Sequence, residues 1–75
     1  MALNNENEGR IRLGAALRVI REAEGLSCED VAQRIGVTRQ TISKIEIGRW
    51  NAGADHLCAI ADALGYEWTL KKKEV

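Results

Sequence analysis

The sequence predicts a small all-α domain of four or five helices. Apolar residues recur at spacings of three and four along most of the chain, which is the periodicity of amphipathic helices. Glycines stand where successive apolar stretches end, as helix stops do. The 75 residues are 45% hydrophobic and 29% charged, the composition of one soluble globular domain. No run approaches the roughly 20 apolar residues that span a membrane, so no membrane role is expected.

The first predicted helix runs from about Arg10 to Glu24 and ends at Gly25, which suits a left-handed cap. Residues 1–9 are polar and acidic, and we expect them to form a flexible tail. They lack the basic start and apolar block of a secretory signal, so a cytoplasmic protein is expected. The helix combines an apolar stripe with intervening arginines: Ile11, Leu13, Ala16, Leu17, Ile20 and Ala23 against Arg12, Arg18 and Arg21.

The second predicted helix covers residues 28–35. Ser27 suits its N-cap, and Asp30, three residues later, completes an approximate capping box. Gly36 supplies the sharp turn that ends the helix. Because the next helix begins almost at once, these two short helices are expected to be neighbours.

The third predicted helix covers residues 39–47 and begins after Thr38, a good N-cap. A loop over residues 49–53 leads to a fourth helix over residues 54–64, which Gly65 ends. The helical domain is therefore predicted over residues 10–65. The side chains expected to point inward from these two helices are Ile42, Ile45, Leu57, Ile60, Ala61 and Leu64.

The C-terminal extension, residues 66–75, changes period. Tyr66, Trp68 and Leu70 alternate with polar residues, which is the spacing of a strand. A single strand in a helical chain has no backbone partner within its own subunit, and the same strand of a second subunit across a two-fold axis would supply one. These three residues are therefore candidates for dimerisation. The alternative is a fifth helix or a frayed tail, in which Trp68 covers the edge of the core.

The charge balance of the whole chain gives no support to a nucleic-acid partner, because 11 basic and 11 acidic residues leave a net charge of zero. The charges are not evenly distributed along the chain. The segment from residue 34 to residue 49 has one acidic residue, Glu46, and four basic ones, Arg34, Arg39, Lys44 and Arg49. A molecule with one basic face and an acidic back can still be steered onto phosphate.

Enzymatic and metal chemistry find little support. Cys28 and Cys58 lack CxxC spacing, and with the single His56 they do not compose a convincing zinc site. His56 has no nucleophile or carboxylate arranged with it, and there is no glycine-rich phosphate loop. No catalytic residue, metal or cofactor is expected. Cys28 at a helix N-terminus is expected to favour the thiolate, which leaves redox sensing as a minor hypothesis.

The run LSCEDVAQRIGVTRQTISKIE, residues 26–46, resembles the lambda-repressor-like helix-turn-helix domains of the Cro and Xre family. The shared features are the Leu-Ser opening, an alanine in the first helix of the motif, the Gly-Val turn, a capped recognition helix and the Ile-x-x-Ile-Glu close. The resemblance continues through residues 59–65 and covers most of the chain. It implies a DNA-binding regulator of bacteria or their phages.

In this family the recognition helix lies in the major groove with its N-terminal residues at base edges. The resemblance implies a base-reading set in which Arg39 and Lys44 donate to guanine and Gln40 makes two hydrogen bonds to adenine. Thr38 completes the set. The alternative is that these four residues form only a solvated helix face and read no base. Phosphate contacts are implied for Thr41, Ser43, Arg49, Trp50 and Asn51. For Trp50 the alternative is that its side chain caps the core.

Four matching positions are implied to be structural. Ala32 is small because the two helices of the motif cross closely there, and Gly36 stands where the backbone turns with positive φ. Arg21 and Glu46 match positions that form a salt bridge between the first helix and the end of the recognition helix.

The favoured hypothesis is a repressor that binds double-stranded DNA as a homodimer on a palindromic operator. The segment 68–70 resembles the strand with which antitoxins of kinase toxin–antitoxin pairs close their dimers, so an autorepressing antitoxin with a toxin partner is a narrower form of it. Two departures from the family pattern, Cys28 and Ile47, each remove a polar DNA contact. They support the competing hypothesis of a protein-interaction adaptor that kept the fold without DNA binding.

Overall fold

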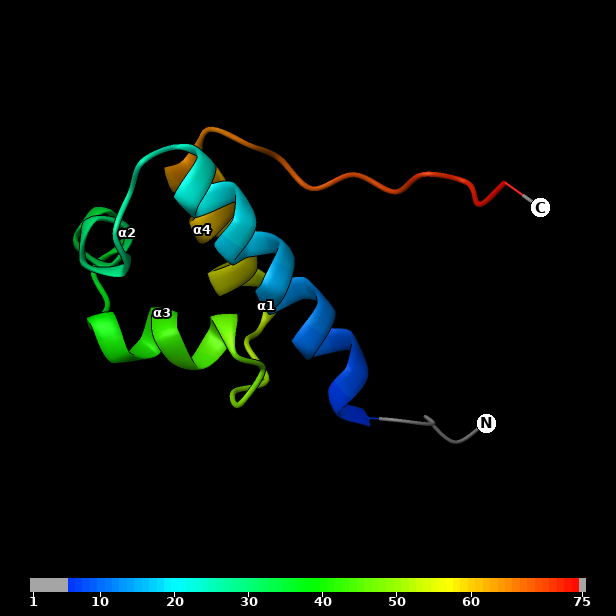
Figure 1. Ribbon diagram of the computed structural model, residues 1–75, viewed down its shortest axis with the longest axis horizontal. Helices are drawn as coiled ribbons and strands as arrows, with labels where there is room; N and C mark the ends of the chain where they lie inside the picture. The colour runs from blue at the N-terminus through cyan, green and yellow to red at the C-terminus, as the bar shows by residue number, and fades with distance from the viewer. Residues whose placement is uncertain (1–5, 75) are drawn as a thin grey trace.

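The computed structural model describes residues 6–74, and these form four helices and no strand (Figure 1). The helices are α1 (Glu6–Ala23), α2 (Cys28–Ile35), α3 (Arg39–Glu46) and α4 (Ala54–Leu64). The all-α prediction is confirmed. Within the described part of the chain, no helix has the length and apolar character that crossing a membrane requires.

The start of α1 differs from the expectation. The helix begins at Glu6, so residues 6–9 are helical and not part of a flexible tail; residues 1–5 of that predicted tail lie outside the described residues. An acidic residue in the first turn favours this longer helix, because it interacts with the positive end of the helix dipole. Glu8 lies in that turn and pairs with Arg12 at 4.0 Å. The end of α3 also differs slightly, since the helix stops at Glu46 and Ile47 is its C-cap.

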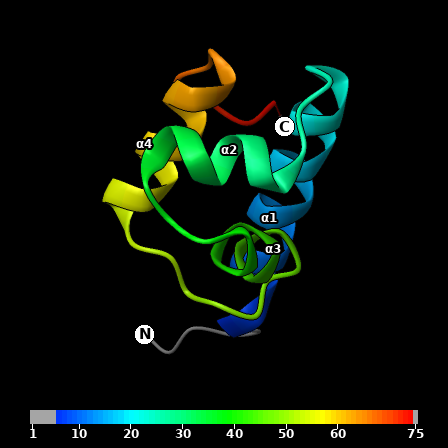
Figure 2. The ribbon, with the colours of Figure 1, turned by 90° about the vertical axis from the view of Figure 1, so that its left-hand side faces the viewer.

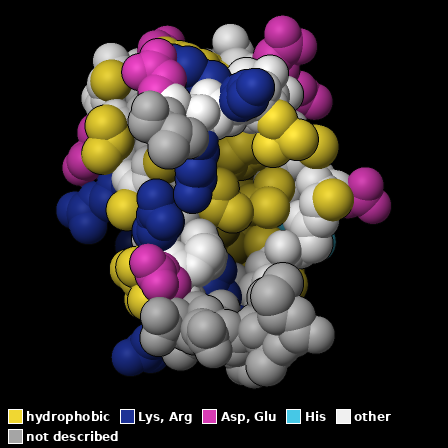
Figure 3. Space-filling view, turned by 90° about the vertical axis from the view of Figure 1, so that its right-hand side faces the viewer, with side chains coloured by type: hydrophobic (Ala, Val, Ile, Leu, Met, Phe, Trp, Pro, Cys, Tyr) yellow, Lys and Arg dark blue, Asp and Glu magenta, His cyan; other side chains and the backbone are white. Residues whose placement is uncertain are grey.

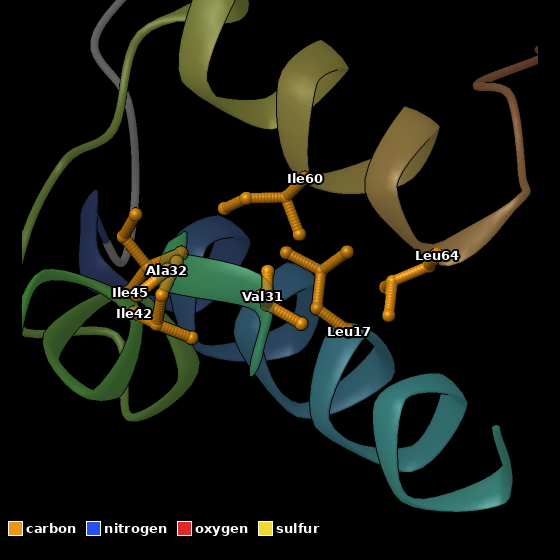
Figure 4. Close-up of a cluster of buried hydrophobic side chains, with 7 residues drawn as sticks. All are labelled: Leu17, Val31, Ala32, Ile42, Ile45, Ile60 and Leu64. Carbon is orange, nitrogen blue, oxygen red and sulfur yellow. The ribbon is translucent and has the colours of Figure 1, made fainter. Parts of the chain in front are cut away.

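One apolar core joins all four helices (Figure 4). Val31 is completely buried and Ile42 is 1% exposed, and both belong to the two short helices. The side chains of α1 and α4 close the core from the other side. The full cluster is Leu17, Val31, Ala32, Ile42, Ile45, Ile60 and Leu64.

The turn between α2 and α3 sets these helices at a steep angle to each other. In Figure 1 α2 is seen end-on while α3 lies in the plane of the picture, and Figure 2 shows the reverse. Gly36 has φ of 76°, the left-handed region that glycine adopts most readily. The amides of Gly36 and Val37 both donate to the carbonyl of Ala32. Ala32 itself is 1% exposed, which fits a small residue at a close crossing.

The N-terminus of α2 carries the predicted capping box. The Ser27 hydroxyl accepts the Asp30 amide at 3.0 Å, and the Asp30 carboxylate accepts the Ser27 amide at 2.8 Å. The hydrogen bond from the Ser27 backbone holds the pKa of Asp30 below its ordinary value of 3.8. The folded state therefore favours the ionised carboxylate.

A pH dependence follows for Asp30→Asn. Because the folded pKa lies below the unfolded one, the contribution of Asp30 to the free energy of unfolding is present above the unfolded pKa and is lost as pH falls through the folded pKa. The variant should be less stable than the parent near neutral pH, and the difference should shrink below about pH 4. Urea denaturation of both proteins across this range measures it. A difference that stays constant down to acid pH would contradict the assignment.

Residues 66–74 form neither helix nor strand, so the fifth helix considered for this segment is absent from the described chain. The first part of the segment is attached to the body. The Tyr66 hydroxyl donates to Glu24 at 3.3 Å, and the Trp68 indole N–H donates to the Leu57 carbonyl at 2.8 Å. Beyond Trp68 the chain leaves the body (Figure 1), and Leu70 is 100% exposed. Pairing of this segment with a second subunit stays a prediction.

Candidate nucleic-acid interface

Helix α3 presents two different faces. Ile42, Ile45 and Glu46 are buried against the other helices. The opposite face is solvent-exposed and carries polar and basic side chains, and no core packing interrupts it. These exposed residues are Arg39, Gln40, Ser43 and Lys44. Helix α3 lies along one edge of the molecule, the lower edge in Figure 1, so this face is open to a large ligand.

The threonines at the start of α3 are occupied by capping. The Thr38 hydroxyl accepts the Thr41 amide at 3.2 Å, and the two hydroxyls lie 2.9 Å apart. Thr41 is half-buried, whereas Thr38 is exposed. The structure therefore gives Thr38 a definite local role, to fix the first turn from which Arg39 and Gln40 project.

The loop after α3 folds back onto the end of that helix. The amides of Arg49 and Trp50 both donate to the Lys44 carbonyl, at 2.9 and 3.4 Å. The side chains of Arg49 and Asn51 are exposed. Trp50 is 39% exposed and its ring meets His56 of α4 edge-on, with 4.9 Å between ring centroids. Trp50 thus packs against α4 with part of its surface and reaches solvent with the rest.

One residue of the basic segment is used elsewhere. Arg34 donates to the carbonyl of Ala63 at 2.8 Å and so joins α2 to the end of α4. The basic residues on or directly after α3 are therefore Arg39, Lys44 and Arg49. A concentration of positive charge on one edge is what phosphate contact needs, even in a chain of zero net charge.

A buried ion pair supports α3 from behind. Arg21 of α1 donates from Nε and Nη2 to the two carboxylate oxygens of Glu46, at 2.7 and 3.0 Å. Only 12% of the Arg21 side chain and 7% of the Glu46 side chain are exposed. Arg21 also donates to the Leu26 carbonyl at 2.7 Å, and the hydrogen bond to Glu46 raises the pKa of Arg21. The salt bridge implied by the family resemblance is present, and its fork geometry fixes the rotation of α3.

A second support of α3, which was not predicted from the sequence, lies at the N-terminal half of α1. Gly14 is buried, and a Cβ built there would lie 2.5 Å from the Glu46 carbonyl oxygen, so α1 and the end of α3 touch through backbone. Gly48 approaches Ile11 of α1 in the same way, with φ of 75°. Arg10 donates to the Gly48 carbonyl at 3.0 Å. A glycine inside an otherwise amphipathic helix was the available signal, because it often marks a close approach.

Cys28 does not have the expected chemistry. Its Sγ is half-buried and lies 3.8 Å from Glu46 Oε1. Burial, and next the negative charge of Glu46, raise the pKa of the Cys28 thiol above its ordinary value of 9.0. The expectation of a favoured thiolate is wrong, because these two effects outweigh the nearby guanidinium of Arg21, which acts in the opposite direction.

The two cysteines are therefore expected to react at different rates with iodoacetamide. Cys58 is exposed and should be alkylated first near neutral pH, while Cys28 should react more slowly because little of it is thiolate. Mass spectrometry of peptides over a time course measures both rates. Glu46→Gln should increase the alkylation rate of Cys28 relative to that of Cys58. Equal rates in the parent protein would contradict the raised pKa.

Two short helices joined by a glycine turn, the second with a polar and basic outer face, define a helix-turn-helix DNA-binding domain. Residues 12–67 match the family described as a helix-turn-helix domain, and the chain belongs to that family.

Relatives agree with this assignment. An uncharacterized HTH-type transcriptional regulator of Methanothermobacter thermautotrophicus is 45% identical over 51 residues, which cover 68% of this chain and 74% of that protein. A hypothetical transcription factor of Neisseria meningitidis is 33% identical over 63 residues, 84% of this chain and 59% of that protein.

Solved structures agree as well. The clp gene regulator ClgR from C. glutamicum is similar with a TM-score of 0.75 and 33% identity, over 77% of this chain and 74% of that one. The restriction-modification controller protein C.AhdI from Aeromonas hydrophila is similar with a TM-score of 0.76 and 32% identity, over 79% of this chain and 89% of that one. The chain is accordingly a DNA-binding transcriptional regulator and not an enzyme.

Proposed function

We propose that this chain is a repressor that binds a palindromic operator as a homodimer in the cytoplasm, with the N-terminal half of α3 in the major groove. One observation carries the proposal: Arg39, Gln40 and Lys44 are exposed on the single face of α3 that no other helix covers. The other face of that helix is held by the core and by the Arg21–Glu46 pair. A rigid helix with an open polar face is what base reading requires.

The proposed base contacts follow from the hydrogen-bonding capacity of each side chain. Arg39 and Lys44 donate to the O6 and N7 of guanine, and Gln40 both donates to and accepts from adenine. Thr38 lies at the same end of the helix. Its hydroxyl already serves the cap, so we propose that Thr38 contributes mainly by placing Arg39 and Gln40.

The proposed phosphate contacts lie beside this set. A DNA backbone running along α3 would meet the loop that folds back onto Lys44. Arg49, which is exposed, supplies the charge there, and we propose that Trp50 donates its indole N–H. The proposed phosphate-binding residues are Thr41, Ser43, Arg49, Trp50 and Asn51.

A narrower form of the proposal is an antitoxin that represses its own operon and binds a toxin protein. The extended segment over residues 66–74 supports it, because such a segment offers backbone for pairing. A toxin gene beside the gene for this chain, whose product binds the purified protein, would establish this form.

Selection from a random duplex library, followed by fluorescence anisotropy at low and moderate salt, tests the proposal. The parent should enrich a palindrome, and Arg39→Ala should weaken binding to it by about 1–3 kcal/mol. Lys71→Ala removes the same charge from the C-terminal segment, which leaves the body at the edge opposite α3 in Figure 1, and should bind like the parent. Failure of the parent to bind any duplex at either salt would favour the adaptor hypothesis.

A further inference from the structure

An apolar groove runs between α1 and α4 on the face that Figure 3 shows. One half of it, about 210 Å³, lies between Leu17 and Ala61 and is already bordered by the chain's own Tyr66 and Trp68. The other half, about 220 Å³, is lined by apolar side chains together with Arg10 and Asn51, and has no such cover among the described residues. We call it the open half; Leu13, Trp50, Ala52 and Leu57 line it.

The C-terminal segment beside this groove has an unused apolar side chain. In extended backbone alternate residues point the same way, so Leu70 follows Tyr66 and Trp68, which both bond to the body. Leu70 has no body left to cover and is 100% exposed. Within the described chain, no backbone hydrogen bond involves residues 67–74, so this stretch also lacks a pairing partner.

The segment and the groove share one side of the molecule. Beyond Trp68 the chain runs out to the right in Figure 1, and the groove opens on that same right-hand side in Figure 3. Two copies placed with these sides together about a two-fold axis would send their segments past each other in opposite directions. From Trp68 to Leu70 an extended chain spans about 7 Å, enough for Leu70 to reach a domain that lies directly against this side.

This arrangement is compatible with DNA binding. Helix α3 lies along the lower edge of Figure 1, not on the grooved side. A two-fold axis drawn vertically in that view leaves both recognition helices on the lower side of the pair, facing one duplex.

We propose that a second copy of this chain covers the groove by exchange of C-terminal segments, with Leu70 of each copy in the open half of the other. The inference rests on the proposed homodimer and names its contact. The two segments pair antiparallel between the domains, which satisfies their backbone groups. Lys71, Lys72 and Lys73 continue past the groove and keep their charges in water.

The open half also touches the DNA-facing loop. Trp50 lines it and belongs to the loop that folds back on α3. Exchange of Leu70 would therefore fix the position of Trp50 and of its neighbours Arg49 and Asn51. Dimer formation and phosphate contact are coupled through this one side chain.

Sedimentation equilibrium of Leu70→Ala measures the contribution of the exchanged residue. Two symmetric leucine contacts are lost, so the dissociation constant of the dimer should rise on the order of 100-fold. Lys71→Ala, on the other side of the extended segment, should dimerise like the parent. Leu70→Ala with an unchanged dimerisation constant, or a parent that stays monomeric at high concentration, would overturn the proposal.

Disulfide trapping locates the contact. In a Cys28→Ala, Cys58→Ala background, Leu13→Cys combined with Leu70→Cys should give a covalent dimer on mild oxidation, whereas Val19→Cys with Leu70→Cys should not. Val19 is 66% exposed on α1 and does not line the groove. A cross-linked monomer would show that the segment folds back on its own groove. Equal dimer yield from Leu70→Cys alone would show that the two Leu70 side chains meet each other at the axis and do not enter the grooves. Either result excludes the exchange.

These results are separable from the operator proposal. Leu70→Ala should weaken binding to a palindrome far more than binding to a single half-site. A protein that forms the Leu13–Leu70 cross-link but binds no DNA would refute the repressor and leave the exchange standing.

Discussion

Replacing Gly14 by alanine is expected to destabilise the protein by about 2–3 kcal/mol, although alanine is the better helix former. The reason is the contact between α1 and the end of α3. A Cβ at residue 14 would meet the carbonyl oxygen of Ile45 and lie 2.8 Å from the carbonyl carbon of Glu46. These are backbone atoms and cannot rotate away, so the helices must separate. Urea denaturation followed by circular dichroism measures the loss.

Gly9→Ala is the matched control, since Gly9 lies in the same helix and a Cβ there would have no heavy atom within 4 Å. This change should stabilise the protein by about 0.5–1 kcal/mol through lower backbone entropy of the unfolded chain. Opposite signs for the two variants are the expected result. If Gly14→Ala were stabilising as well, α1 and α3 would not be in backbone contact.

Glu46→Gln is expected to lower the free energy of unfolding by about 3 kcal/mol, because it leaves the guanidinium of Arg21 buried without a counter-charge. Arg21 and Glu46 are 12% and 7% exposed, so water cannot easily replace the lost carboxylate. The variant should also weaken DNA binding, since the pair fixes the rotation of α3. Thermal unfolding and operator affinity, measured on the same preparation, report the two effects.

Glu22→Gln provides the comparison. Glu22 pairs with Arg18 at 3.6 Å, but both side chains are more than half exposed, and such pairs contribute only about 0.3–0.5 kcal/mol. A loss for Glu46→Gln no larger than this would show that the buried pair does not hold the recognition helix.

The helix boundaries that depend on local chemistry were predictable from the sequence. Ser27 and Thr38 cap α2 and α3 as expected, and Gly36 and Gly65 end α2 and α4 in the left-handed conformation. These signals work because a cap satisfies backbone groups within a few residues of itself. The exposed face of α3 was also predictable from local sequence, because the spacing of Ile42 and Ile45 shows which face of the helix points inward.

Features that depend on contacts distant in sequence were not predictable. The close approach of Gly14 to α3 joins residues more than thirty positions apart, and the burial of Cys28 beside Glu46 reversed the chemistry inferred from its place at a helix start. The bond from Arg34 to Ala63 removed one cation from the expected basic edge. Each depends on how helices pack, which periodicity does not specify.

The C-terminal segment lies between these cases. Its alternation predicted extended backbone, whereas the alternative of a fifth helix or frayed tail placed Trp68 at the edge of the core. Trp68 does bond to α4. The same alternation gave no indication that an apolar groove opens beside it, since α1 and α4 form that groove together.

Operator affinities of the parent and of Gln40→Ala, against the selected operator and a set in which each base pair is replaced in turn, test most directly whether α3 reads bases. Replacing one A·T pair in each half-site should weaken the binding free energy of the parent by about 1–3 kcal/mol and that of the variant hardly at all. Every other replacement should affect both proteins equally. If no base pair shows this dependence on Gln40, or if the variant is weakened equally on all sequences, Gln40 does not read a base and the proposed mode of recognition is wrong.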